Sequence, residues 1–157
     1  MLSHTAEYAL RALVHLAALP AGKAILGKDL ADRAAIPARY LSKILWVLGT
    51  AGIIDATRGS GGGYRLRRPA REIRLAEVVD LFDKARARPV CLLGWNPECS
   101  DAKPCPAHAA WKNVRDAYIR FLEMTTIADI AHLPGEGRPA AEGLVPGADK
   151  EGFCGPY

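Results

Sequence analysis

Residues 37–68 read PARYLSKILWVLGTAGIIDATRGSGGGYRLRR, and this stretch decides the fold. It opens with Pro37, which suits the start of a helix because the missing N–H is not needed there. Apolar residues then recur at steps of three and four, which is typical of a helix with one buried face. They are Tyr40, Leu41, Ile44, Leu45 and Leu48. We expect this helix to end near Gly49 and Gly52.

The second half of the stretch holds a glycine-rich turn, residues 59–63, between two runs of extended character. Consecutive glycines tolerate positive φ and let the backbone pass close to a neighbour. We predict a two-stranded hairpin, or wing, with Arg58 at its base and Arg65, Arg67 and Arg68 beyond its tip. A phosphate-binding loop is the competing interpretation. Such a loop opens into a helix, whereas this one leads into Tyr-Arg-Leu-Arg.

The residues upstream predict two more helical segments. Residues 5–19 carry apolar side chains at helical spacing, and residues 24–36 repeat the pattern briefly. A short helix followed by an amphipathic one is the unit that places a recognition helix in the DNA major groove. The predicted fold class is therefore mainly α, with a winged helix-turn-helix DNA-binding domain over residues 1–89 and a two-stranded wing.

Two helices are predicted downstream, a short one over residues 75–85 and a long one over residues 109–132. The long helix carries an apolar stripe of Trp111, Val114, Tyr118, Phe121 and Thr125. Such a stripe can pack on its own domain. Because helix-turn-helix proteins bind DNA as two-fold dimers, we expect it to form the dimerisation helix. Residues 133–157 lack periodicity, and we expect a disordered tail in which Cys154 is incidental.

Charge is unevenly spread along the chain. The net charge is +4, yet residues 1–89 hold fifteen Lys and Arg against eight acids, and residues 90–157 hold six against nine. A basic half is a footprint of nucleic-acid binding, although ordinary solvated charges are an alternative. The candidate DNA-binding residues from the helix and the wing are Arg39, Ser42, Lys43, Arg58, Gly59, Ser60, Gly61 and Arg65.

Residues 90–108 form a cysteine-rich loop with three of the four cysteines, Cys91, Cys99 and Cys105. The chain has no apolar run near the roughly 20 residues that span a bilayer, so we expect a cytoplasmic protein without a membrane partner. Thiols stay reduced there, and clustered cysteines more often bind metal than form disulfides.

Three chemistries remain open for this loop, two with a metal and one without. Thiolates are the ordinary ligands of iron–sulfur clusters. Structural zinc sites generally show C-x-x-C pairs, which this loop lacks, although Cys105 and His108 form a C-x-x-H. A metal-free thiol redox switch is the third alternative. We find no Ser/His/Asp set, paired acids or nucleotide loop that would indicate an enzyme, and an electron-transfer role would leave the arginine-rich wing without a purpose.

The segments YLSKIL, RGSGGGYRLRRPAREIRLAEVVD and PAHAAWKNVRDAYIRFL, with three cysteines before the last, resemble the Rrf-type transcriptional regulators. The resemblance covers about residues 1–132 and includes the IscR, NsrR and RirA branches. It implies a winged-helix homodimer whose long C-terminal helices cross, bound to double-stranded operator DNA. It also places Arg39, Tyr40, Lys43 and Arg58 against DNA.

The same resemblance implies an iron–sulfur cluster, 2Fe–2S or 4Fe–4S, held by Cys91, Cys99 and Cys105. The fourth ligand would be His108, as in the IscR branch, or Glu7 of the partner subunit, as in the NsrR branch. The chain departs from the IscR pattern in its longer first cysteine spacing and in Ser42, where IscR has a glutamate. We therefore expect a DNA-binding repressor whose affinity follows iron, redox state or nitric oxide, with a zinc-binding or metal-free thiol switch as the alternative.

Overall fold

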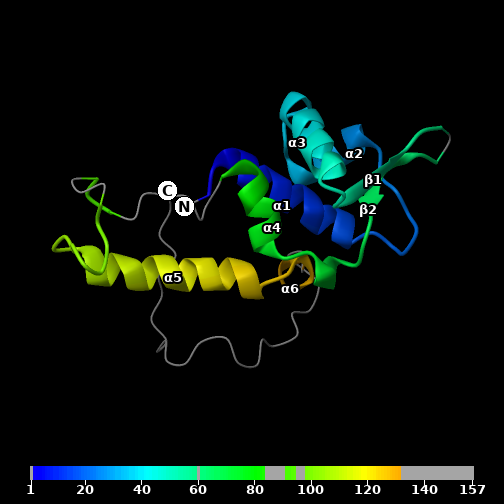
Figure 1. Cartoon of the computed structure of the whole chain (residues 1–157). Helices are drawn as coiled ribbons and strands as arrows, with labels where there is room; N and C mark the ends of the chain where they lie inside the picture. The colour runs from blue at the N-terminus through cyan, green and yellow to red at the C-terminus, as the bar shows by residue number, and fades with distance from the viewer. Residues whose placement is uncertain (1, 60, 84–90, 95–97, 132–157) are drawn as a thin grey trace, which may run out of the picture.

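The computed structural model describes residues 2–59, 61–83, 91–94 and 98–131, and it is mainly helical with a two-stranded sheet (Figure 1). The elements in chain order are α1 (His4–Ala17), α2 (Gly27–Ala34), α3 (Ala38–Thr50), β1 (Ile54–Thr57), β2 (Gly63–Leu66), the 3₁₀ turn η1 (Ala70–Glu72), α4 (Leu75–Phe82), α5 (His108–Met124) and α6 (Ile127–Ile130). The predicted fold class is confirmed: α2 and α3 form a helix-turn-helix, and β1 and β2 form the wing.

The helix-turn-helix follows from local signals in the sequence. The hydroxyl of Ser3 accepts a hydrogen bond from the Ala6 amide at 3.2 Å and caps α1. Ala35 takes a left-handed conformation, with φ +51°, and ends α2. This turn lets α3 begin after Pro37 and bury Leu41, Ile44, Leu45 and Leu48 against α1 and α2. Gly52, with φ +71°, then leads the chain from α3 into β1.

The wing is an antiparallel pair whose register runs from Ile54 opposite Leu66 to Thr57 opposite Gly63. The amide and carbonyl of Tyr64 also bond to Ile25, at 2.8 and 3.0 Å. A Cβ on Gly63 would lie 2.3 Å from the Ile25 carbonyl oxygen, so this close approach requires glycine. The predicted placement of the arginines is wrong. Arg58 begins the turn at the tip, and Arg65 lies within β2.

Arg67 and Arg68 follow the opposite end of the hairpin, because β2 returns from the tip toward the body of the domain. The Arg67 side chain lies 3.7 Å from Asp55, and that of Arg68 forms an ion pair with Glu77 on α4. Arg68 therefore ties the wing to the helices behind it.

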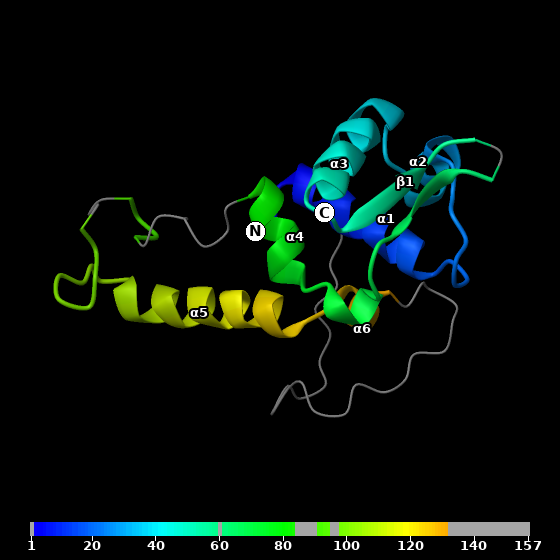
Figure 2. The same cartoon turned by 45° about the vertical axis from the view of Figure 1, so that its right-hand side comes forward.

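One core unites α1 to α4, and it includes fully buried Leu13, Leu30, Leu48, Ile53 and Val78. We call residues 2–83 the head. α5 contacts α4, and both views show it extending away from the head, with residues 98–107 beyond its N-terminal end (Figures 1 and 2).

The helix predicted over residues 109–132 is shorter than expected, because α5 ends at Met124. The Thr125 carbonyl accepts a hydrogen bond from the Leu75 amide, and the Ile127 amide donates to the Ile73 carbonyl, at 2.9 and 2.8 Å. These two bonds hold the chain extended across the start of α4. Thr126 and Asp129 then form a capping box that starts α6.

The predicted tail, residues 133–157 with Cys154, lies outside the described residues, as does Ser60. In the described part of the chain, no helix combines the length and the apolar character that crossing a membrane requires.

Candidate metal centre and DNA-binding surface

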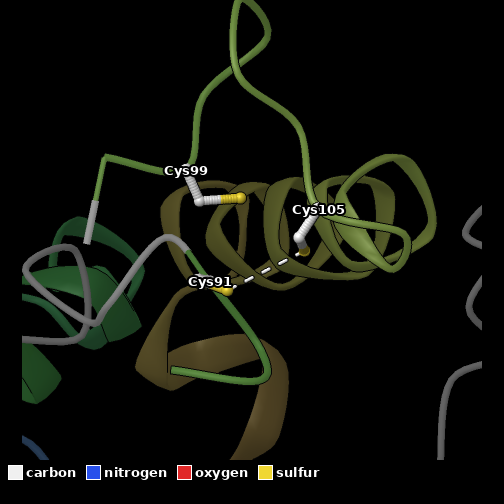
Figure 3. A group of neighbouring side chains, drawn as sticks. All are labelled: Cys91, Cys99 and Cys105. Atoms are coloured by element: carbon white, nitrogen blue, oxygen red, sulfur yellow. Dashed lines mark hydrogen bonds between the residues drawn. The ribbon is translucent and has the colours of Figure 1, made fainter. Parts of the chain in front are cut away.

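The three predicted cysteine ligands meet at the N-terminal end of α5 (Figure 3). All three Sγ atoms lie within 4.8 Å of one another, and those of Cys91 and Cys105 are 3.8 Å apart. Cys91 and Cys99 are buried and Cys105 is half-buried. Burial, with hydrogen bonds to Cys99 and Cys91, raises the pKa of the Cys105 thiol. Three thiolates this close would repel one another, so a bound cation would stabilise the deprotonated group.

His108 is the first residue of α5 and lies beside this thiol group, with only 6% of its surface exposed. Its Nδ1 is 3.2 Å from the Cys99 Sγ, and its Nε2 is 3.0 Å from Oδ1 of Asp101. The other carboxylate oxygen of Asp101 accepts a hydrogen bond from Lys112 at 2.6 Å. The bonds from Lys112 and His108 lower the pKa of the Asp101 carboxyl, so it is ionised at neutral pH.

Glu7 is exposed on α1, where its carboxylate lies 3.4 Å from Nδ1 of His4. Within the described residues, the group of atoms that could hold one metal ion is that of Cys91, Cys99 and Cys105, and it includes neither His108 nor Glu7 of the same chain. The assignments of a fourth ligand to His108 or to Glu7 of the partner subunit both stay predictions.

The three thiols, with His108 as the candidate fourth donor, are compatible with both metal chemistries that the sequence left open. Thiolates with an imidazole can hold an iron–sulfur cluster. Cys3His is also a structural zinc set, and two sulfurs bound to one tetrahedral zinc at about 2.3 Å would lie about 3.8 Å apart. That separation matches the 3.8 Å between Cys91 and Cys105. The three thiols are therefore close enough to hold a soft metal ion, and their geometry does not choose the metal.

The predicted DNA-binding residues of α3 lie on its exposed side. Arg39, Ser42 and Lys43 are exposed, and the Ser42 hydroxyl donates to the Ala38 carbonyl at 3.0 Å. Tyr40, which the periodicity placed on the buried face, is exposed instead, with the Arg39 guanidinium 4.9 Å from its ring centre. The Tyr40 ring lies beside the Tyr8 ring, with the two ring centroids 6.4 Å apart, instead of packing into the core.

The wing residues Arg58, Gly59, Gly61 and Arg65 are exposed as well. Gly59 and Gly61 have φ of +96° and +77° and open space around them, which suits a turn that approaches a ligand. The head therefore presents a basic helix and a basic hairpin to solvent, the combination that a winged helix uses on DNA.

Three side chains that the sequence pattern did not indicate lie in these surfaces. Trp46 is 72% exposed on α3, three residues after Lys43, beside a shallow hollow between α3 and the wing. Its place outside the buried stripe was a usable signal. Asp101 contacts both His108 and Lys112. In the sequence, this arrangement is indicated only by the four-residue step from His108 to Lys112, which places both on one side of a helix.

The predicted dimerisation stripe divides into two parts. Val114 is 60% exposed, and Phe121 and Met124 are exposed too, whereas Thr125 is buried in its own chain. Tyr118 packs against the core. The buried indole Nε1 of Trp111 has no hydrogen-bond partner among the described residues. Large apolar side chains thus remain uncovered along the outer face of α5.

The fold and the basic helix and hairpin define the class, a winged helix-turn-helix DNA-binding protein. Residues 2–133 match the family described as "Iron-dependent Transcriptional regulator", or Rrf2. The chain belongs to this Rrf2 family of transcription regulators, which are DNA-binding proteins and not enzymes. The predicted resemblance is confirmed.

Among its relatives, NsrR of Geobacillus kaustophilus is 33% identical over 129 residues, covering 82% of this chain and 88% of that one. Protein rrf2 of Nitratidesulfovibrio vulgaris is 33% identical over 129 residues, covering 82% and 85%. Among solved structures, the global cysteine regulator CymR of B. subtilis has a TM-score of 0.69 at 24% identity, covering 83% and 95%. IscR of T. potens has a TM-score of 0.64 at 25% identity, covering 83% and 85%.

Proposed function

We propose that this chain is a homodimeric repressor whose affinity for double-stranded operator DNA is controlled by an iron–sulfur cluster. The carrying observation is the thiol group: residues up to fourteen positions apart place three Sγ atoms within 4.8 Å. Cys91, Cys99 and Cys105 would hold the cluster, with His108 or Glu7 of the partner subunit as fourth ligand. The donor chemistry and the family description, an iron-dependent regulator, support this assignment.

The basic surface of the head would bind the operator. Arg39, Tyr40, Ser42 and Lys43 on α3 would enter the major groove, where donors at the start of a recognition helix reach base edges. Arg58 and Arg65 with the turn at residues 59–61 would meet the minor groove, whose negative potential favours arginine. Phosphate contacts make such binding strongly dependent on salt.

The stripe on α5 would join two copies. Trp111, Val114, Tyr118 and Phe121 lie on one side of the helix, and Val114 and Phe121 are exposed in the single chain. Thr125 bonds within its own chain and would add little. A two-fold pair of heads is what an operator with two half-sites requires.

A contiguous path connects the thiol group to the head. His108 starts α5, α5 packs on α4, and α4 packs on α1. A bound iron–sulfur cluster would provide an iron centre that is sensitive to iron availability, oxidants or nitric oxide. When the cluster is bound, its ligand residues would fix the position of α5 and so the spacing of the two heads. A coupling free energy of about 1–3 kcal/mol would change DNA affinity 5- to 150-fold.

The test is oxygen-free purification followed by absorption and Mössbauer spectra and by iron, sulfide and zinc analysis. We expect visible absorption with iron and sulfide in the wild type. Cys99→Ala should lose both, together with the response of DNA binding to the signal. The matched control is Cys154→Ala, which should keep them. A colourless, iron-free protein that still regulates operator binding would refute the cluster.

A zinc-binding or metal-free thiol switch is the second candidate, and the 3.8 Å between the Cys91 and Cys105 sulfurs is compatible with it. It predicts zinc, or no metal, in the purified protein. It also predicts a disulfide after mild oxidation, detectable by mass spectrometry, with a matching change in DNA affinity. The same metal analysis therefore separates the two candidates.

A further inference from the structure

A chain of polar contacts runs behind the thiol group. Two of its residues, Asp101 and Lys112, have no role in the function proposed above. Lys112 donates to Asp101 at 2.6 Å, Asp101 contacts Nε2 of His108 at 3.0 Å, and Nδ1 of His108 contacts the Cys99 sulfur at 3.2 Å. His108 is buried, whereas Asp101 lies exposed on the loop. Asp101 therefore holds the His108 imidazole from the solvent side, and Nδ1 on the other side of the ring faces the Cys99 thiol.

The identity of each group decides where the imidazole proton lies. An aspartate carboxylate can only accept hydrogen bonds, and Asp101 accepts one from Lys112 on its other oxygen. The Nε2 of His108 must therefore carry the proton and donate it to Asp101. In a neutral imidazole the Nδ1 is then unprotonated, and its lone pair points at Cys99, whose S–H can donate to it.

We propose that Asp101, braced by Lys112, is a positioning residue that fixes the tautomer and ring orientation of His108 so that Nδ1 is the atom offered to the metal. This proposal rests on the proposed function, in which His108 is a candidate fourth ligand. Metal-binding histidines usually donate their other ring N–H to a carboxylate or carbonyl, which raises their basicity and holds the ring. The contacts of Asp101 supply that arrangement in this chain, and they make His108 a better candidate than an unsupported histidine.

The chain offers a matched control on the same loop. Glu98 is an exposed acid that pairs with Lys103 at 2.6 Å, just as Asp101 pairs with Lys112. Glu98→Ala and Asp101→Ala remove the same charge from the same loop, but only the second removes the acceptor from His108. Both residues are exposed, so neither substitution should lower the unfolding temperature of the metal-free protein by more than about 4 °C.

The first measurement uses metal-free, reduced protein with ¹⁵N-labelled histidine at about pH 9, where an ordinary imidazole is neutral. Ring nitrogen shifts, assigned with His108→Gln, report the tautomer. We expect one Nε2–H tautomer for His108 in the wild type and in Glu98→Ala, and a mixture in Asp101→Ala. Lys112→Ala should give a smaller shift toward the mixture. An unchanged tautomer in Asp101→Ala, or protons on both nitrogens in the wild type, would overturn the proposal.

The second measurement uses the anaerobically purified, loaded protein and the rate at which a chelator removes its iron. We expect Asp101→Ala to lose iron about 10- to 100-fold faster than wild type, the usual cost of losing such a partner, and Glu98→Ala to match wild type. Equal rates in all three proteins would mean that Asp101 does not support a ligand. If the wild type carries no iron at all, the cluster proposal fails, while the tautomer result still decides the role of Asp101.

Discussion

The head and the cysteine end of this molecule are held together by different forces. Helix α4, with eight residues, buries four apolar side chains, whereas α5, with seventeen, buries only His108 and Leu122. In the described part of residues 91–107, the buried side chains are those of Cys91 and Cys99. An apolar core holds the head together, whereas the cysteine end is held by contacts among sulfur atoms, an imidazole and ion pairs.

This difference predicts which part of the molecule responds to a bound metal. Burying one Leu, Ile or Val contributes about 1.5–3 kcal/mol, so we expect the apolar core to hold the head folded without a ligand. Exposed ion pairs such as Lys112 with Asp101 contribute about 0–1 kcal/mol. We therefore expect the order of the cysteine end to depend on a metal bound by its thiols, and that of α5 on a partner that covers its outer face.

The largest expected effect tests the contrast directly with two identical substitutions. Leu48→Ala removes a fully buried side chain from the head and should lower the free energy of unfolding by about 2–5 kcal/mol. Leu92→Ala, in the exposed cysteine loop, should change it by less than about 0.5 kcal/mol. Denaturant titration measures both. Comparable losses would show that the cysteine end has an apolar core of its own.

The next prediction concerns the uncovered face of α5. Val114→Asp places a charge on the exposed stripe and should raise the dimer dissociation constant at least about tenfold, because burying an unpaired charge is costly. Asn113→Asp adds the same charge one residue away, off the stripe, and serves as the control. Sedimentation velocity measures both. An equal effect from the two variants would place the dimer contact elsewhere.

Trp46 sharpens the contrast within the head, since it is a large apolar side chain that the core leaves exposed. It lies on the side of α3 that carries Lys43. Trp46→Ala should weaken binding to an operator duplex about three- to tenfold through lost apolar contact with thymine methyls, without changing the salt slope. Arg58→Ala should instead reduce that slope by about 1. Fluorescence anisotropy at several salt concentrations distinguishes them.

Leu81→Ala, an exposed residue on α4, is the control for these DNA measurements and should leave the affinity unchanged. If Trp46→Ala binds as tightly as wild type, the outer side of α3 meets DNA through its polar residues alone.

The smallest expected effect is a pH dependence in the head. Burial, with the nearby Arg33 and Arg11, lowers the pKa of His15 below its ordinary value of about 6.5. The unfolded chain then binds the proton more readily, so stability declines as the pH falls through the ordinary pKa toward the lowered one. His15→Gln should flatten this part of the stability curve. An unchanged slope between about pH 7 and 5 would assign it to other groups.

Much of the head was predictable because its signals are local. The step of three and four in α1 and α3 and the glycines of the wing specify elements that form wherever an apolar face can be buried. The site was partly predictable: the cysteine spacing indicated a metal loop, and the structure brings those three thiols together.

Other features were not predictable, because they depend on distant partners. Tyr40 matches the apolar period of α3 yet lies beside Tyr8 and Arg39. Residues 109–132 have a continuous helical pattern. The helix nevertheless ends early, because Thr125 and Ile127 form backbone hydrogen bonds with residues 73–75 instead. A pattern of residue types does not reveal which distant backbone will compete for a hydrogen bond.

The sequence by itself determined most of the elements, the family and which three cysteines gather, since each of these follows from residue types at short spacing. Only the tertiary structure decided that Asp101 and Lys112 face His108, that Trp46 stays outside the core, and that α5 has an uncovered side. The physical reason is the distance along the chain over which each interaction acts. Helix and turn preferences act over a few residues, whereas hydrogen-bond partners and burial are set by elements that meet only after the chain has folded.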